Sequence, residues 1–189
     1  MSKVYYQSVN SGTTPAEIRQ ITEELLKELI ARENVTLEKC IPLKVHFGEK
    51  GNSTFLKPEN YEGILQYLHE NRLETCYMET SVMYGGQRHC KALHLKTAAE
   101  HGFTQVPIVI ADGENGEAFT EVEINKKHFR RCKLGREFTP YRQFIVLAHF
   151  KGHMLAGFGG AIKQLSMGFA SKGGKLAMHM GIKPHIVNR

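Results

Sequence analysis

The sequence predicts an α/β domain of three layers: a largely parallel central sheet, helices on both of its faces, and a β-hairpin insertion. Short apolar runs typical of buried strands alternate with longer segments of helical periodicity along the chain. Such alternation is typical of parallel sheets, whose right-handed crossover connections place helices on both faces. No linker or low-complexity tract interrupts the pattern, so residues 1–189 are expected to form a single domain, with the hairpin inserted at about residues 117–134.

The N-terminal part of the chain is expected to supply three strands and three helices in alternation. Its first helix has the clearest signals, because Thr14 and Pro15 suit the cap and the first position of a helix. Apolar residues of this helix recur at helical spacing, at Ile18, Ile21, Leu25 and Leu29. The expected strands are residues 4–9, 40–47 and 74–82, and the expected helices are residues 15–32, 58–72 and 87–102.

The C-terminal part continues with a buried strand, the hairpin, the most apolar strand of the chain and a last helix. The expected strands are residues 106–112 and 143–150, the hairpin arms are residues 118–124 and 128–135, and the helix is residues 159–171. The tail, residues 172–189, is expected to be irregular or loosely helical.

Composition and charge narrow the classes of function. With 41% hydrophobic residues and no run of about 18 apolar ones, the chain is expected to cross no membrane. The N-terminus lacks the apolar core of a signal peptide, so a cytoplasmic location is expected. A net charge of +6 favours anionic partners. The cysteines, Cys40, Cys76, Cys90 and Cys132, form no C-x-x-C pair and are expected to be reduced, packed thiols.

Polar side chains follow four of the expected strands, at the edge of a parallel sheet where ligands bind. An imidazole there, from His46 or His149, can transfer protons near neutral pH. A carboxylate, Glu79 or Asp112, would orient the histidine or hold a divalent ion. The predicted catalytic residues are His46, His149, Lys151 and Glu79.

A glycine-rich turn, "AGFGGAIKQL", precedes the last expected helix. Glycines allow the backbone N–H groups at a helix N-terminus to approach an anion closely, and Lys163 lies one turn into this helix. The glycines are equally compatible with close packing of the helix on the sheet. The residues expected to bind an anionic ligand, a phosphate or a carboxylate, are Lys44, Lys50, Asn52, Gly157, Gly159, Gly160 and Lys163.

A divalent metal can accompany the anionic ligand. In an extended strand His149 and His153 would lie about 13 Å apart, too far for one ion, and Lys151 between them would repel a cation. A site that includes His46 from another strand is geometrically easier. The predicted metal ligands are therefore His46, His153 and Asp112.

Three long segments carry a family resemblance: "KVHFGEKGNSTFLKPE", "IVIADGENGEAFTEVEINKKHF" and "VLAHFKGHMLAGFGGAIKQLSMGFASKGGKLAMH". They closely resemble the uncharacterised iron–sulfur (Fe-S) centre proteins, which share a domain of unknown function numbered 362. The resemblance implies a ferredoxin-like segment, usually after this region, that binds 4Fe-4S clusters. None of the cysteines here matches a cluster ligand, so this chain is expected to lack that segment and to involve clusters only if a further segment follows. The resemblance implies no settled reaction, and whether the chain is an enzyme stays open.

Two non-catalytic functions are the alternatives. The chain can serve as a scaffold or docking half for an iron–sulfur module, and that module or a second copy of the chain is then the expected partner. The basic run "NKKHFRRCKLGRE" can contact nucleic acid, but it lacks the interleaved exposed aromatic residues of a stacking platform. A solvated hairpin is the favoured interpretation of this run, and nucleic acid is not the expected partner.

Overall fold

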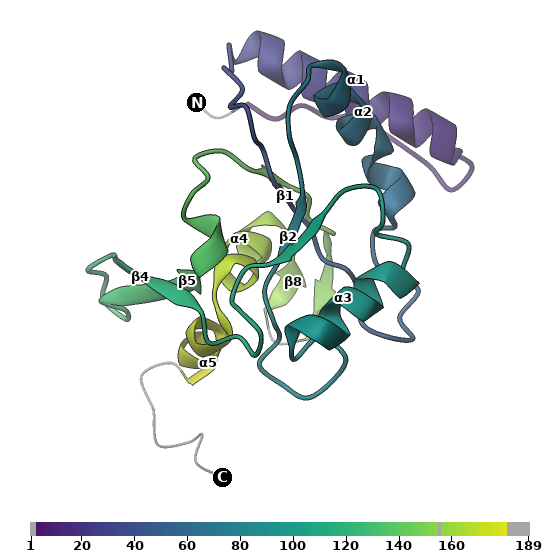
Figure 1. The fold of residues 1–189 in the computed structure, drawn as a ribbon. Coiled ribbons are helices and arrows are strands. Elements are labelled where there is room, and N and C mark those ends of the chain that lie inside the picture. Colours follow the sequence, from purple (N-terminus) through teal and green to yellow (C-terminus); the bar gives the residue numbers. More distant parts are fainter. Residues whose placement is uncertain (1–2, 155, 181–189) are drawn as a thin grey trace.

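The fold is built around a four-stranded parallel sheet (Figure 1). The computed structural model describes residues 3–154 and 156–180. The strand order is β3-β2-β1-β6, and all three neighbouring pairs are parallel. The strands are short: β1 is Leu43–Lys44, β2 is Tyr77–Glu79, β3 is Ile108–Ile110 and β6 is Ile145–Val146.

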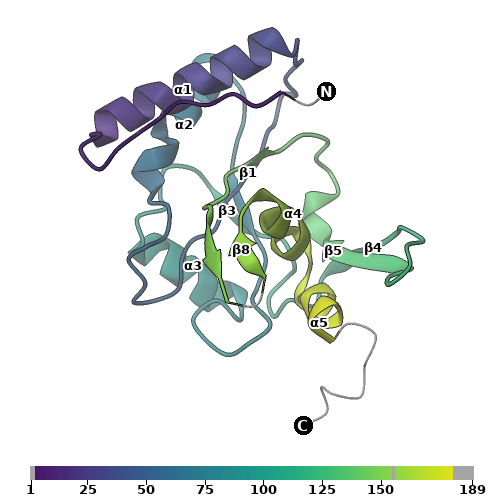
Figure 2. The ribbon, with the colours of Figure 1, turned by 180° about the vertical axis from the view of Figure 1, so that it is seen from behind.

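Helices cover both faces of this sheet, which confirms the predicted fold class. Figures 1 and 2 view the sheet from opposite sides, with α3 in front of it in one view and α4 in front in the other. A short 3₁₀ turn leads into α2, and α1 lies against α2 at one end of the molecule. The helices are α1 Pro15–Arg32, η1 Pro58–Tyr61, α2 Glu62–Glu70, α3 Lys91–Glu100, η2 Arg136–Phe138, α4 Ala161–Phe169 and α5 Lys172–Met180.

Strand alternation divides the apolar core into two clusters. Successive side chains of a strand point to opposite faces, so Tyr77 packs into the larger cluster and Met78 into the smaller one. The larger cluster lies under α2 and α3 and includes Leu43 and Leu68. The smaller cluster includes Phe138, with Phe169 of α4 packed against it. Both faces of the sheet are thereby buried, as a parallel sheet requires.

Two antiparallel hairpins extend the fold. The predicted hairpin is present as β4, Phe119–Glu123, paired with β5, Arg131–Gly135. A second hairpin, β7 Lys151–His153 paired with β8 Gly157–Gly159, replaces the plain glycine-rich turn that the sequence predicted. Gly157 has φ 73°, a left-handed conformation that glycine adopts without strain.

The segment at residues 4–9 corrects one prediction, since it forms no strand. It runs beside α1 instead of joining the sheet (Figure 1), and Val4 and Tyr6 are exposed. Tyr5 holds it there by donating a hydrogen bond to Glu33, while the guanidinium of Arg32 lies 5.8 Å from the centre of the Tyr5 ring. A segment with strand-like alternation forms a strand only where it can pair with the edge of another strand. Residues 4–9 lie beside the helix α1 instead.

The tail is more regular than predicted, because residues 172–180 form the helix α5. Ser171 accepts a hydrogen bond from the backbone N–H of Gly174 and caps the first turn. Residues 181–189 lie outside the described part of the chain. Within the part that is described, no helix has the length and apolar character needed to cross a bilayer.

Two adjacent glycines of α5 provide a matched test of how closely this helix packs on β5. A Cβ at position 174 would lie 2.3 Å from the carbonyl oxygen of Lys133, so Gly174→Ala is expected to lower the free energy of unfolding by about 1–3 kcal/mol. At position 173 the nearest atom, Cδ of Lys133, is 3.9 Å away. Gly173→Ala is therefore expected to stabilise the protein by up to about 1 kcal/mol. Urea denaturation measures both, and equal effects would contradict close packing of α5 on β5.

Candidate functional site

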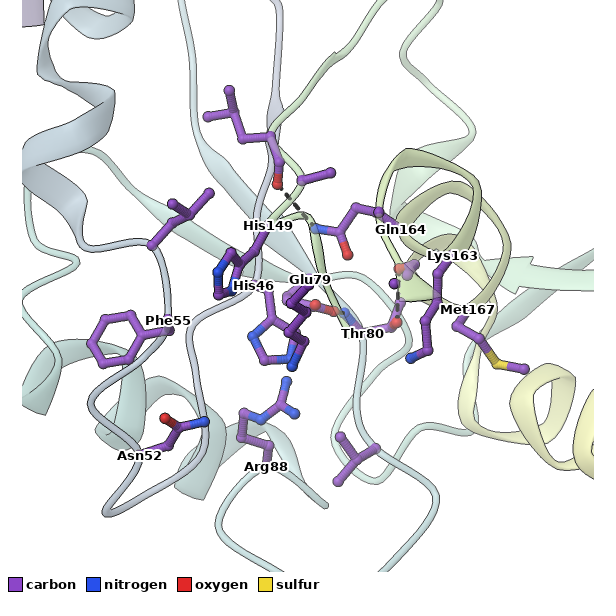
Figure 3. A pocket seen from close by; sticks show the side chains of 18 of the residues that line it. His46, Asn52, Phe55, Glu79, Thr80, Arg88, His149, Lys163, Gln164 and Met167 are labelled. Carbon is purple, nitrogen blue, oxygen red and sulfur yellow. Dashed lines mark hydrogen bonds between the residues drawn. The ribbon is translucent and has the colours of Figure 1, made fainter. Parts of the chain in front are cut away.

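A cavity of about 160 Å³ lies at the carboxyl ends of the parallel strands (Figure 3). Residues that end or follow three strands form part of its wall: His46 after β1, Glu79 at the end of β2 and His149 after β6. Gly160 and Lys163, at the start of α4, form another part. Ligands bind parallel α/β sheets at this edge, because the loops there are free to converge on a ligand.

Beneath the cavity, β1 and β2 are joined by a buried ion pair between Lys44 and Glu79. Leu43 and Val45 point into the larger cluster, so Lys44 points to the opposite face of the sheet, under α4. Its Nζ lies 3.0 Å from Oε1 of Glu79 and donates a hydrogen bond to the Val45 carbonyl at 2.8 Å. A Cβ at Gly168 would lie 2.9 Å from this Nζ, so glycine there lets α4 cover the pair.

The Glu79 carboxylate is held in its charged form. Burial disfavours the charge, but Lys44, Lys175 and Arg88 outweigh burial and lower the pKa of Glu79 to about 2. Arg88 is itself buried and pairs with Glu49 through Nε, at 2.9 Å, and Nη2. The negative charge of Glu79 is thus fully engaged by protein cations before any ligand arrives.

The cavity wall carries a surplus of positive charge. It contains the cations Arg88, Lys151, Lys163 and Lys175 but a single carboxylate, Glu79, among the residues that the structure describes. Burial, and then the charges of Lys151 and Arg88, lower the pKa of Lys163. None of the wall residues from Leu147 onward is an Asp or Glu, and the sequence contains neither after Glu137. An anion in the cavity would relieve this repulsion.

His46 is a neutral hydrogen-bond donor in this site. Its Nδ1 accepts a hydrogen bond from the backbone N–H of Gly48 at 3.0 Å, so its proton is on Nε2. Burial, and then the charge of Arg88, lower the pKa of His46 to about 3. The ring can therefore donate through Nε2, whereas proton abstraction or metal binding at Nδ1 would first break the bond to Gly48.

The structure brings most of the predicted site residues to one cavity. Figure 3 shows His46, Glu79 and His149 with Lys163 and Asn52 around the same space. The predicted residues on the wall are His46, Asn52, Glu79, His149, Lys151, Gly159, Gly160 and Lys163.

Five predicted residues lie elsewhere. Lys44 is beneath the wall in its ion pair, and Lys50 and Gly157 are exposed away from it. Asp112 is buried and accepts hydrogen bonds from the backbone N–H groups of Ser81 and Lys172, at 2.9 and 3.0 Å. Asp112 therefore ties the end of β2 to the start of α5. The fifth residue, His153, is half-buried in β7.

The three predicted metal ligands, His46, His153 and Asp112, do not share the cavity wall. Within residues 3–154 and 156–180, no three His, Cys, Asp or Glu side chains form a group able to hold a metal ion. The same finding applies to an iron–sulfur cluster, because the four cysteines are free thiols and belong to no such group within these residues. Cys76, for example, is buried, and burial raises its pKa to about 11. The residues present do not fit a cluster.

Two cations of the wall, Arg88 and Lys175, were not among the predicted site residues. Arg88 precedes α3 and is buried with Glu49, which the sequence gives no reason to expect. Lys175 belongs to the tail that was expected to be irregular, and only the formation of α5 carries it to the cavity. Ser171, a residue type that favours the N-cap position, is the local signal for a helix start here.

The positive charge of the basic hairpin is offset in part by its own acidic residues. Arg130 pairs with Glu123, and Arg131 with Glu121, across β4 and β5. Lys133 lies over the ring of Phe119, 4.6 Å from its centre. Lys126 and Lys127, at the end of the hairpin, are exposed.

Comparison with protein families gives one match. Residues 41–188 match the family profile described as a domain of unknown function (DUF362). The chain belongs to this family. No match was found among curated proteins or among solved structures. The DUF362 region contains the whole parallel sheet and every residue of the cavity wall, whereas α1 precedes it.

Besides His46, a second histidine of the DUF362 region is kept neutral by burial. His94 of α3 is fully buried, and in the described structure neither ring nitrogen has a hydrogen-bond partner. It packs edge-on against Phe47, with ring centres 5.4 Å apart. Burial lowers the pKa of His94 to about 3, from an ordinary value of 6.5. The imidazole is thus kept neutral by its apolar surroundings.

We expect these histidines to make stability depend on pH. Because the pKa of His94 is lower in the folded state, the unfolded state binds more protons between pH 6.5 and about 3. The free energy of unfolding therefore decreases as pH falls below 6.5, by up to about 1.4 kcal/mol per pH unit for each such histidine. His94→Leu removes one of these contributions and a buried unpaired polar group, so it is expected to flatten the profile and to stabilise the protein at pH 5.

Urea denaturation at a series of pH values measures this effect. His69→Gln is the matched control, because His69 is exposed at the end of α2. A profile unchanged by His94→Leu would show that His94 is not buried in its neutral form.

Proposed function

We propose that this DUF362 domain binds a small anion, a phosphate or a carboxylate, in the cavity at the strand ends. The observation that carries the proposal is the charge of the wall, which has four cationic side chains and one carboxylate among the described residues. That carboxylate, Glu79, is already paired with Lys44. Arg88 is likewise paired with Glu49, so Lys151 and Lys163 would hold a bound anion, with Lys175 also on the wall.

The start of α4 supports this proposal. The first turn of a helix presents N–H groups that have no partner within the helix, and the helix dipole makes this end positive. Gly160 is the N-cap of α4 and lies on the wall, and Lys163 lies in the same first turn. Backbone donors and a lysine therefore converge from one element on the cavity.

The size of the cavity limits the ligand. Its volume of about 160 Å³ is close to that of an engineered cavity of ~150 Å³ that holds benzene. The enclosed part of a ligand then has about six non-hydrogen atoms, as in inorganic phosphate or a short carboxylic acid. A larger molecule would extend out of the cavity.

The residues around the anion also allow proton transfer, and an enzymatic reaction is part of this proposal. His149 lines the cavity after β6 and would be the proton donor or acceptor, while His46 would donate a hydrogen bond through Nε2. Lys151 would stabilise negative charge that develops on the substrate. A divalent ion would have to share Glu79 with Lys44, so we assign the binding to the cations.

Replacing one wall lysine tests the proposal. Lys163→Gln is expected to weaken the binding of inorganic phosphate about tenfold or more, because a charge-assisted hydrogen bond is lost. Lys126→Gln removes the same charge from the exposed end of the β4–β5 hairpin and is the control. Isothermal titration calorimetry with phosphate and with acetate gives both affinities. The proposal fails if wild-type protein binds neither anion, or if both variants weaken binding equally.

A docking function is the second candidate, and exposed apolar side chains on β8 and α4 favour it. Phe158, Ile162 and Leu165 are large hydrophobic residues that are 54%, 76% and 52% exposed. Lys163 lies among them, and residues 138–189 contain no acidic side chain, so a partner with an acidic and apolar surface fits best. In this candidate function the partner is an acidic iron–sulfur protein, and the chain would be coupled to redox chemistry through it.

Removing two exposed apolar side chains tests the docking function. The double variant Ile162→Ser and Leu165→Ser is expected to abolish binding to a purified acidic 4Fe-4S ferredoxin, because it removes apolar area from the contact. Val122→Ser, at an exposed position on β4, is the control. Analytical ultracentrifugation measures the complex and also reports self-association. Absence of any complex with the wild-type protein would remove this candidate.

A further inference from the structure

Lys175 differs from the other cations of the cavity wall in its hydrogen-bond partners. Its side chain lines the cavity, and the residue is only 8% exposed. Nζ donates hydrogen bonds to the hydroxyl of Thr80 and, at 2.8 Å, to the carbonyl oxygen of Ala170, both uncharged acceptors. Glu79 pairs with Lys44 instead, which leaves Lys175 with no ion pair among the described residues.

A buried amine without a paired carboxylate is closer to its neutral form than an exposed one, because the charged form loses its hydration. Burial lowers the pKa of Lys175 to about 8. The positive charges of Lys44 and Arg88 act in the same direction, and the negative charges of Glu79 and Asp112 oppose them. At pH 7 about one side chain in ten then carries a free electron pair on Nζ.

The position of Nζ is also fixed. Thr80 accepts the hydrogen bond from Lys175 and donates its own hydroxyl hydrogen to the Gly168 carbonyl at 3.0 Å. Two of the three Nζ donors are therefore satisfied by atoms of the protein. An amine held in one place at a cavity wall is pre-organised to attack a ligand in that cavity.

We propose that Lys175 is a nucleophile that forms a Schiff base with an aldehyde or ketone carrying a carboxylate or phosphate group. The inference rests on the proposed function, since Lys151 and Lys163 would hold the anionic group of the substrate. Small 2-oxo acids, with about six non-hydrogen atoms, fit the cavity volume of about 160 Å³.

The chemistry balances without an oxidant or a reductant. The ammonium of Lys175 first loses one proton to solvent, and the Nζ electron pair then attacks the carbonyl carbon to form a C–N bond. The former carbonyl oxygen takes up the two remaining Nζ protons and leaves as water, and a C=N bond results. Protonation of the imine nitrogen returns one proton, so the net change is ammonium plus carbonyl compound to iminium plus water.

Reductive trapping tests this inference on the intact chain. Purified protein is incubated with glyoxylate or pyruvate and sodium cyanoborohydride, and peptide mass spectrometry measures the modification of each lysine. Lys175 is expected to be modified at least about tenfold faster than Lys126, an exposed lysine in the same sample. Inorganic phosphate, as a competing anion, and Lys163→Gln are both expected to slow the trapping of Lys175.

Phosphate binding and trapping, both measured on the wild-type protein, separate the two proposals. Lys175→Arg has no amine that can form a Schiff base, so it is expected to give no adduct at position 175. The comparison of lysines within the wild-type protein does not depend on the folding of any variant. If Lys175 is modified no faster than Lys126 while phosphate still binds, the Schiff-base inference is wrong and the proposed function stands. If phosphate neither binds nor slows the trapping, the assignment of an anionic substrate is wrong.

Discussion

The buried ion pair between Lys44 and Glu79 is the constraint around which the site is arranged. Both residues lie at the ends of central strands and are almost completely buried, so little water can solvate their charges. Removing two charges from water costs more than their attraction returns unless further hydrogen bonds satisfy them. Here the Val45 carbonyl and the Thr80 backbone N–H supply such bonds, and Gly168 allows α4 to exclude solvent. The position of α4 follows from its covering this pair. The first turn of α4 is thereby placed on the cavity wall.

The distribution of charge along the chain then determines what the cavity can hold. The N-terminal part of the DUF362 region supplies the carboxylates Glu49, Glu79 and Asp112, and each is engaged by protein donors. After Glu137 the chain contains only basic and uncharged residues, and this part forms β7, β8, α4 and α5. The charged side chains of these elements are therefore all positive. The cavity lies between these elements and the ends of the sheet strands.

Local signals made the elements predictable, and long-range contacts limited the prediction of the site. The bounds of α1 agree with the prediction because its start is encoded locally, by a capping box between Thr14 and Glu17. The edge of the sheet that carries the cavity follows from parallel topology, which the strand–helix alternation predicts. The recruitment of Arg88 and Lys175 depends instead on partners 39 and 95 residues away in the chain, Glu49 and Thr80. Periodicity carries no information on contacts at such separations.

Burial of this site from water makes its positive charges costly, but it strengthens their attraction to a bound anion. Burial lowers the pKa values of Lys163 and Lys175, which means that each of these positive charges is costly without a bound anion. The same burial strengthens the attraction between those charges and a bound anion, because little water screens it. An anion therefore raises the pKa of its lysine partners, so that binding and proton uptake are coupled. A carbonyl substrate adds one condition, since Lys175 must lose its proton before it can react while Lys163 keeps its own. The arrangement meets that condition by burying Lys175 more deeply than Lys163.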